Sequence, residues 1–347
     1  MRKTFRLSAA FACVLLFIAA FPFAACSKKD DPYKDGAVSI GAMNGPTMIG
    51  LAKLDRDMKD GKTENLYSFE KVATPTEITA GLISKKYDAA ALSSNTAAFH
   101  FNNPDLDVQI AAVNVYNVFY LVVNADKAET NGINSLQDLS GKTIHSSGKD
   151  AVPEFVLKYL LEKNGLTDSV GTEFYPEPTA VVQGLLSGII DVALLPQPAA
   201  STAVEQGKAQ GKNIEIRLDF AHEWKKTEGN ADMDIITGVL VVRRAFLKNN
   251  KDAFDRFLAD YKTSVNFMKD GANLDAAAEL VVDLGIIAAK DRDLSINIAK
   301  SALPLCGLTY ADGVEMKDKV SAFYKNMFDQ NKAFVGGKLP TDGFYYI

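Results

Sequence analysis

The side chains best suited to chemistry in this sequence are hydroxyl and amide groups in short polar loops. Each loop adjoins an apolar segment predicted to be a strand, and the groups are Asn44, Thr47, Ser93, Ser94, Asn95, Asn117, Ser146, Ser147 and Gln197, with Gly148 beside them. Hydroxyl and amide groups donate and accept hydrogen bonds, so several together can hold a small polar solute without reacting with it. A turn or helix-cap role is the alternative for each one. We therefore expect a ligand-binding site made of loops.

Aromatic and basic residues narrow the class of ligand. Tyr116, Tyr175 and Trp224 occupy loop-like positions where a ring can stack on a planar ligand, although core or hinge packing is the commoner role. The predicted strand-end loops contain no Arg, and Arg243 and Arg244 are expected to face away from the site. A bidentate guanidinium grip on a sulfonate or carboxylate is therefore not expected. A neutral or weakly charged ligand such as a pyrimidine-like ring is favoured, and an oxyanion held by N–H groups and hydroxyls is the alternative.

Residues for catalysis or metal binding form no recognisable pattern. His100, His145 and His222 lack the spacing of a metal site, and neutral His145 could reach a ligand from its strand end, whereas His100 is expected to pack near the surface. A Gly-rich phosphate loop, a Gly-x-Ser-x-Gly elbow and a Cys-x-x-Cys pair are all missing from the sequence. Cys306 is expected to be a buried apolar thiol. We expect a protein without a cofactor or metal that is not an enzyme.

An internal duplication positions the polar loops. At a constant offset of 103 residues, the stretches 75–98 and 178–201 are identical at nine of 24 positions, including Gly81/Gly184 and Asp88/Asp191. Each copy predicts a helix, a turn, a strand, a loop and a second helix. Because a solenoid needs at least three repeats, two distant copies indicate two similar α/β lobes. Ligands bind beyond the carboxyl ends of the strands in open α/β sheets, so the loops should face a cleft between the lobes.

The remaining segments predict how the chain connects the lobes. Apolar strands over residues 118–124 and 233–242 are expected to cross between them as a hinge. We expect one lobe to contain residues 37–121 and 240–347, and the other to contain residues 122–239. The helices predicted after Arg244 should pack on the first lobe and complete it.

The start of the chain reads as a secretory signal. Arg2, Lys3 and Arg6 precede an apolar run that ends at small residues before Cys26, so residues 1–25 are expected to be removed. Residues 26–36 are charged and contain one Pro, which is typical of a flexible tether. An ordinary signal peptide cut after Ala25, or an uncleaved anchor, is the alternative. Nothing later in the sequence is apolar for long enough to span a membrane.

Charge argues against a nucleic-acid partner. The 347 residues carry a formal net charge of −5, and loss of the basic residues near the N-terminus would make the mature protein more acidic. Its length is sufficient for two lobes with cores of their own.

Several motifs together resemble a known family. They are the small residues before Cys26, the Gly-Pro-Thr turn at 45–47, the segment SLQDLSGKTI at 135–144, the run GLLSGIIDVALLPQP at 184–198, and residues 237–246. In order and spacing they resemble the extracytoplasmic solute-binding proteins of ABC importers, in the branch that binds sulfonates, nitrate and thiamine-pyrimidine precursors.

The resemblance implies a two-lobed type II periplasmic-binding-protein fold, in which each lobe is a sheet flanked by helices and two crossings form the hinge. It also implies a monomer that closes on a small molecule and delivers it to an ABC permease. The protein would be held outside the cytoplasm, at a bacterial membrane or in the periplasm, by a lipid such as palmitate on Cys26. The alternatives are an enzyme of the same fold acting on a pyrimidine-like substrate, and a surface-anchored sensor or adhesin. Enzymatic relatives carry a Cys-rich iron-binding motif with His residues, which this sequence lacks.

Overall fold

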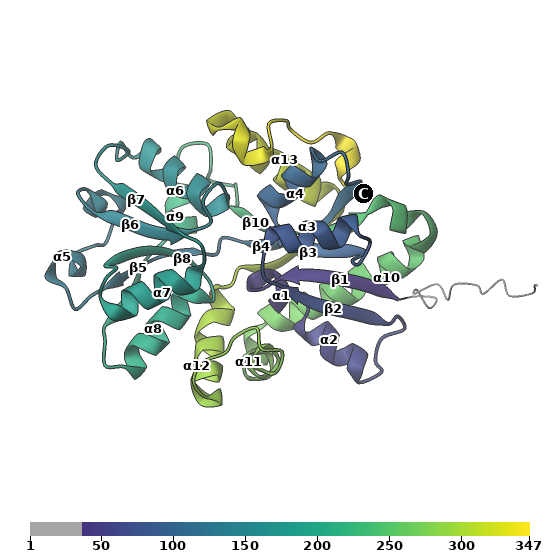
Figure 1. Cartoon of the computed structure of the whole chain (residues 1–347), viewed down its shortest axis with the longest axis horizontal. Helices are drawn as coiled ribbons and strands as arrows, with labels where there is room; N and C mark the ends of the chain where they lie inside the picture. Colours follow the sequence, from purple (N-terminus) through teal and green to yellow (C-terminus); the bar gives the residue numbers. More distant parts are fainter. Residues whose placement is uncertain (1–36) are drawn as a thin grey trace, which may run out of the picture. The chain divides into compact units, whose positions relative to one another are not determined.

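Short apolar segments bounded by Gly, Pro and Asn form two mixed sheets in the computed structural model, which describes residues 37–347 (Figure 1). The expected signal at 1–25, the tether at 26–36 and Cys26 lie outside the described residues. The first sheet has the order β11-β4-β10-β3-β1-β2. Its strands are β1 (Val38–Met43), β2 (Tyr67–Val72), β3 (Ala89–Ser93), β4 (Val108–Tyr116), β10 (Ile236–Arg243) and β11 (Leu308–Ala311).

The second sheet repeats the plan of the first. Its order is β7-β6-β8-β5-β9, built from β5 (Phe119–Asn124), β6 (Thr143–Ser147), β7 (Gly171–Tyr175), β8 (Val192–Pro196) and β9 (Ile214–Asp219). In each sheet a central strand pairs in parallel with two neighbours, β1 with β2 and β3, or β6 with β7 and β8. The next strand runs antiparallel and comes from the other half of the chain, β10 beside β3 and β5 beside β8.

The chain crosses between the sheets twice. β4 ends at Tyr116 and β5 begins at Phe119, and the return path runs from α9 through residues 227–235 to β10. β5 and β10 therefore lie wholly in the sheets that they enter, and both crossings come a few residues before the expected boundaries at 121 and 240.

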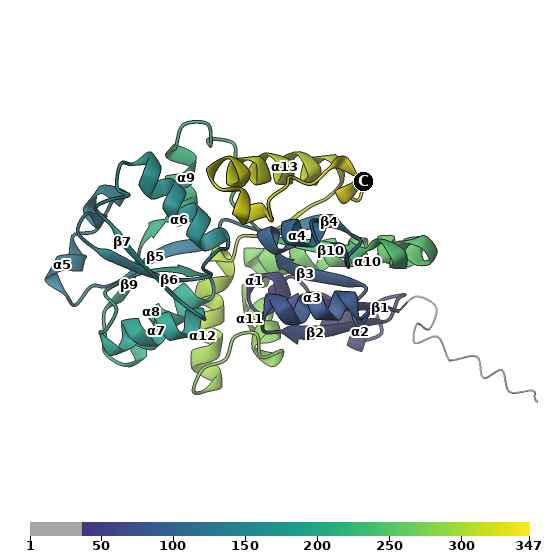
Figure 2. The same ribbon diagram turned by 45° about the horizontal axis from the view of Figure 1, so that its top comes forward.

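Helices cover both sheets (Figures 1 and 2). On the first half they are α1 (Pro46–Ile49), α2 (Ala52–Lys59), α3 (Pro75–Ile83), α4 (Ser94–Phe101), α10 (Arg244–Lys269), α11 (Leu274–Asp283), α12 (Arg292–Ala302) and α13 (Gly313–Gln330). On the second half they are α5 (Ala128–Asn131), α6 (Val152–Lys163), α7 (Pro178–Ser187), α8 (Ala199–Ala209) and α9 (Phe220–Lys226). Among residues 37–347 no helix is long and apolar enough to cross a membrane.

The duplicated stretches form the expected units, α3-β3-α4 and α7-β8-α8. Their shared glycines let the following chain pack closely against the helix. A Cβ on Gly81 would lie 2.1 Å from Tyr87, and a Cβ on Gly184 would lie 2.4 Å from the equivalent Ile190. Both glycine carbonyls also accept the backbone N–H of that residue, 3.2 Å to Tyr87 and 3.0 Å to Ile190. The same close contact between helix and following chain therefore occurs in both copies of the duplicated unit.

Helices α12 and α13 also contact the second half of the protein. α12 packs against α8, and Phe323 of α13 contacts Phe155 of α6 and Trp224 of α9, with ring centroids 5.6 and 6.1 Å apart. Trp224 is fully buried in this cluster. Trp224 lies in α9 and not in a loop, and its ring takes the core-packing role that was the alternative to stacking on a ligand.

Candidate ligand-binding cleft

A cavity of about 510 Å³ lies where strand ends of the two sheets meet. The first sheet contributes residues that follow β1, β2 and β3, and Thr237 near the start of the antiparallel β10. The second contributes residues at and after the ends of β6, β7 and β8, and Phe119 at the start of the antiparallel β5. The cavity thus occupies the place where open α/β sheets bind ligands.

Most of the predicted site residues line this cavity. They are Asn44, Thr47, Ser93, Asn95, Ser147, Gly148 and Tyr175. Two hydroxyls are already engaged within the protein: Thr47 Oγ1 donates to the Met43 carbonyl at 2.7 Å, and Ser93 Oγ lies 2.7 Å from Thr96 Oγ1. Asn95 is 4% exposed, and its Oδ1 has no hydrogen-bond partner among the described residues. Asn95 is therefore the lining side chain with the clearest unmet need for a partner.

The other predicted residues, Ser94, Tyr116, Asn117, Ser146 and Gln197, do not line the cavity. Ser94 Oγ donates to the Ile236 carbonyl at 2.5 Å, and Ser146 Oγ donates to the Leu194 carbonyl at 2.9 Å. Gln197 is fully buried and accepts the Ser201 N–H at 3.2 Å, while its Nε2 has no partner among the described residues. These side chains connect strands and helices at the cavity edge.

Tyr116 and Asn117 belong to the crossing between the sheets. Asn117 has a positive φ of 51° and donates to Asp234 Oδ1 at 2.9 Å on the return crossing. Asp234 also pairs with Lys225 of α9 and Lys319 of α13, at 3.0 and 3.3 Å. Lys319 lies 5.0 Å above the Tyr116 ring. Both predicted residues therefore hold the two crossings together.

Apolar groups that sequence reasoning missed supply much of the remaining wall. Val115, Val118, Phe119 and Val152 line the cavity, and so do six prolines: Pro46, Pro75, Pro153, Pro176, Pro178 and Pro196. Four of the prolines stand in the first turn of α1, α3, α6 and α7, where the missing N–H costs no helical hydrogen bond. The recurrence of Pro directly after predicted strands was the available signal.

Helix starts bring backbone N–H groups to the same cavity. α6 and α7 begin there without a side-chain cap, at Ala151 and Glu177. The positive end of a helix dipole favours a negative or electron-rich group. The cavity can therefore accept hydrogen bonds from a ligand at Asn95 and offer N–H donors at the helix starts.

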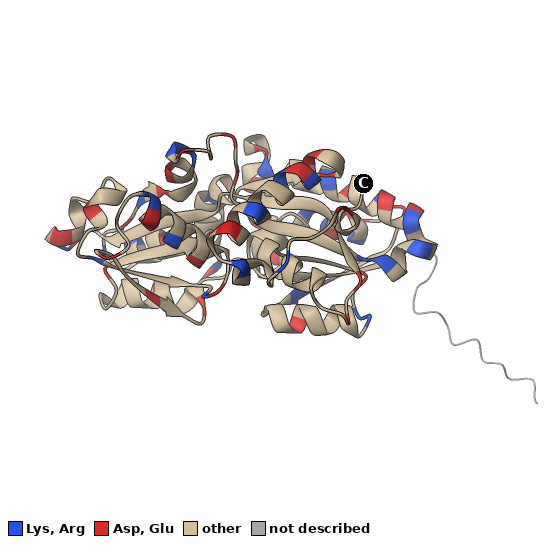
Figure 3. Ribbon diagram, turned by 90° about the horizontal axis from the view of Figure 1, so that it is seen from above, with Lys and Arg blue, Asp and Glu red and all other residues tan. Residues whose placement is uncertain are grey.

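Charged side chains are few in the cavity wall. Lys149 and Glu177 are the charged residues of the lining, both are exposed, and no Arg is part of it. Arg243 is instead paired with the buried Asp88 at 2.6 Å, and Arg244 is paired with Asp107 at 2.7 Å, away from the cavity as expected. Elsewhere on the chain, acidic and basic residues are interspersed (Figure 3).

No histidine and no cysteine of residues 37–347 lines this cavity. His145 packs beside Tyr175 with ring centroids 5.8 Å apart. His100 is 2% exposed and hydrogen-bonded to Thr79, so it packs beneath α3. Cys306 is fully buried as predicted, and burial raises the pKa of its thiol. Within residues 37–347 no group of three or more His, Cys, Asp or Glu side chains could hold a metal ion.

Solved structures share this architecture. An ABC transporter protein from Parabacteroides distasonis is 19% identical, with a TM-score of 0.72 over 90% of this chain and 99% of that one. The alkanesulfonate-binding protein SsuA from Xanthomonas axonopodis pv. citri, bound to MOPS, is 12% identical, with a TM-score of 0.63 over 89% and 96%. The nitrate-binding protein NrtA from Synechocystis is 12% identical, with a TM-score of 0.60 over 86% and 82%. The predicted type II periplasmic-binding-protein fold is confirmed.

No curated protein sequence is significantly similar to the chain. The family model described as NMT1/THI5 like matches residues 70–271, which is more than half of the sequence and includes both duplicated stretches. The chain therefore belongs to the NMT1/THI5-like family.

Proposed function

We propose that this protein is the solute-binding component of an ABC import system, which takes a small molecule into the cleft and delivers it to a membrane permease. The observation that carries the proposal is the 510 Å³ cavity lined by strand ends of both sheets. A ligand in that position contacts both halves of the protein at once. Solved structures of the same fold include an alkanesulfonate-binding and a nitrate-binding protein, which supports this proposal.

The ligand we propose is neutral or weakly charged, with a flat or apolar body and a hydrogen-bonding edge. Phe119, Tyr175 and the prolines offer apolar surface, and Asn95 offers an unpaired acceptor. A pyrimidine-like ring or thiamine precursor has both features. A sulfonate or nitrate-like anion is the alternative, held by the helix starts and Lys149 because the wall contains no Arg.

Binding is proposed to close two lobes, one built around each sheet, about the crossings at Asn117 and Asp234. A ligand that bridges both lobes stabilises the closed form by mass action. We also propose that residues 1–25 are removed and that a lipid on Cys26 holds the monomer outside the cytoplasm, at a bacterial membrane or in the periplasm.

A thermal-shift screen tests the proposed function. The protein from Ser27 onward, stripped of bound ligand by partial unfolding, is screened against sulfonates, nitrate, pyrimidines, flavins and amino acids. One class should raise the melting temperature and reduce the radius of gyration. No shift from any class would contradict solute binding and favour a sensor or adhesin, and turnover of the bound molecule would favour an enzyme.

Paired substitutions locate the site. Asn95→Ala and Ser147→Ala should each weaken binding of the ligand about fivefold, the cost of one hydrogen bond worth about 1 kcal/mol. Ser187→Ala is the matched control, because this exposed hydroxyl on α7 bonds only to its own helix at Gly184. Equal affinity of all three variants would remove the cavity from the binding mechanism.

A further inference from the structure

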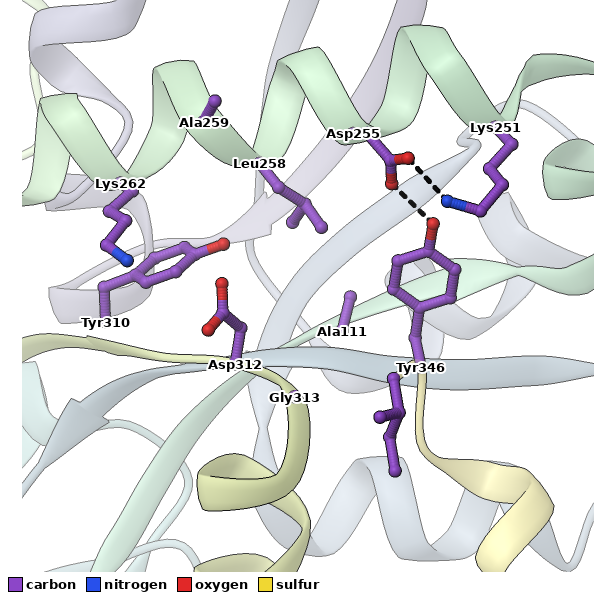
Figure 4. A pocket seen from close by; sticks show the side chains of 11 residues that line it. Ala111, Lys251, Asp255, Leu258, Ala259, Lys262, Tyr310, Asp312, Gly313 and Tyr346 are labelled. Atoms are coloured by element: carbon purple, nitrogen blue, oxygen red, sulfur yellow. Dashed lines mark hydrogen bonds and ion pairs between the residues drawn. The ribbon is translucent and has the colours of Figure 1, made fainter.

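A second cavity, of about 450 Å³, lies on the first half of the protein and shares no residue with the cleft (Figure 4). One face of α10 forms its roof, through Lys251, Asp255, Leu258, Ala259 and Lys262. Spacings of three and four residues place these side chains on one side of the helix. The opposite wall comes from Ala111 of β4, from β11 and the turn after it, and from the last residues of the chain. Small side chains on both walls leave the space open.

One end of this cavity is closed by a complete set of polar contacts. Asp255 accepts a hydrogen bond from Lys251 at 2.6 Å and another from the Tyr346 hydroxyl at 2.5 Å. Lys251 also lies 5.4 Å from the centre of the Tyr346 ring. The polar groups of these three side chains therefore have hydrogen-bond partners within the protein and need no ligand.

The other end holds the same three residue types without those contacts. Lys262 lies 5.3 Å from the centre of the Tyr310 ring, and Asp312 stands beside that tyrosine (Figure 4). Among the described residues neither Lys262 nor Asp312 forms an ion pair, and the Tyr310 hydroxyl makes no hydrogen bond within 3.5 Å, although burial and then the neighbouring Asp312 carboxylate raise the pKa of Tyr310. A cation and an anion without ion-pair partners therefore border one space, and the Tyr310 hydroxyl lies beside the anion.

We propose that this end of the cavity binds a small zwitterion, an α-amino acid with a branched apolar side chain. Its carboxylate would accept hydrogen bonds from Lys262 and the Tyr310 hydroxyl, and its ammonium group would donate to Asp312. Leu258, which is 8% exposed, offers apolar surface for the side chain. A molecule with one charge would satisfy one of the two ionic groups and leave the other unpaired. The site is independent of the cleft and of the function proposed for it.

Calorimetric titration with three probes tests the zwitterion. L-leucine carries both charges, 3-methylbutylamine lacks the carboxylate, and 4-methylpentanoate lacks the ammonium group. Leucine should bind saturably and at least about tenfold more tightly than either single-charge probe, because each charge-assisted hydrogen bond adds to the affinity. Equal binding of the three probes, or no binding of leucine, would overturn the proposal.

Variants separate this site from the cleft. Lys262→Met and Asp312→Asn should each reduce leucine affinity at least about fivefold, and Tyr310→Phe about twofold to fivefold. Lys248→Met is the matched control, because this exposed lysine of α10 is not part of the cavity wall, and its loss should leave leucine affinity unchanged. The side chains of Lys262, Asp312 and Lys248 are exposed, so these variants should keep the parent melting temperature within a few degrees. Leucine binding that is lost in Asn95→Ala and retained in Lys262→Met would place leucine in the cleft and refute the second site.

Discussion

Burial of His100 should make the first half of the protein sensitive to mild acid. The imidazole is 2% exposed, its Nε2 lies 2.9 Å from Thr79 Oγ1, and its Nδ1 has no partner among the described residues. Burial lowers the pKa of His100 to about 4, from an ordinary value of 6.5. Since the folded-state pKa lies below the unfolded-state pKa, the unfolded chain binds the extra proton between these two values. Stability is therefore complete above about pH 6.5 and falls as the pH drops toward about 4.

The two pKa values set the size of the effect. At about pH 5, protonation of His100 stabilises the unfolded state by about 2 kcal/mol more than the folded state. At about pH 7.5 this difference is close to zero. His100→Gln removes the titrating group and keeps an amide that can bond to Thr79. Between about pH 7.5 and about pH 5, the free energy of unfolding should therefore decrease by about 2 kcal/mol less for His100→Gln than for the parent protein.

Urea unfolding followed by circular dichroism at both pH values measures the difference. The exposed His222, changed to Gln, is the matched control and should keep the pH dependence of the parent protein. If His100→Gln and the parent lost equal stability between about pH 7.5 and about pH 5, the imidazole would be protonated in the folded state and the argument from burial would fail.

Two further substitutions test the packing of the duplicated units. Gly184→Ala should lower the free energy of unfolding by about 1–2 kcal/mol in urea titration, because the new Cβ would meet the buried Ile190 at 2.4 Å. Gly132→Ala, where nothing lies within 4 Å, should change it by less than about 0.5 kcal/mol, and equal effects at both glycines would contradict the clash. Arg243→Met should cost about 3–5 kcal/mol because it leaves the fully buried Asp88 without its charged partner at 2.6 Å. Recovery of that loss in Arg243→Met combined with Asp88→Asn would confirm the cause, and a fully stable single variant would refute it.

Local sequence patterns predicted the elements that position the cleft. The repeat at 75–98 and 178–201 became α3-β3-α4 and α7-β8-α8, since helical spacing and apolar runs depend on near neighbours along the chain. The sequence also predicted that the polar loops after β1, β3 and β6 lie at the cavity, because these loops directly follow the predicted strands. Which residue of a loop lines the cavity was harder to predict. Ser147 does and Ser146 does not, because successive strand residues point to opposite faces.

The sequence by itself therefore determined the two duplicated α/β units, the strand-end loops and the resemblance to solute-binding proteins. Only the tertiary structure decided that Trp224 fills a core between the halves, that α3 buries His100 and that Asn117 binds Asp234 across the hinge. These contacts join residues 21 to 117 positions apart in the chain, and the aromatic contact of Trp224 links α9 to α13. Local periodicity carries no information over such separations, whereas packing in three dimensions does.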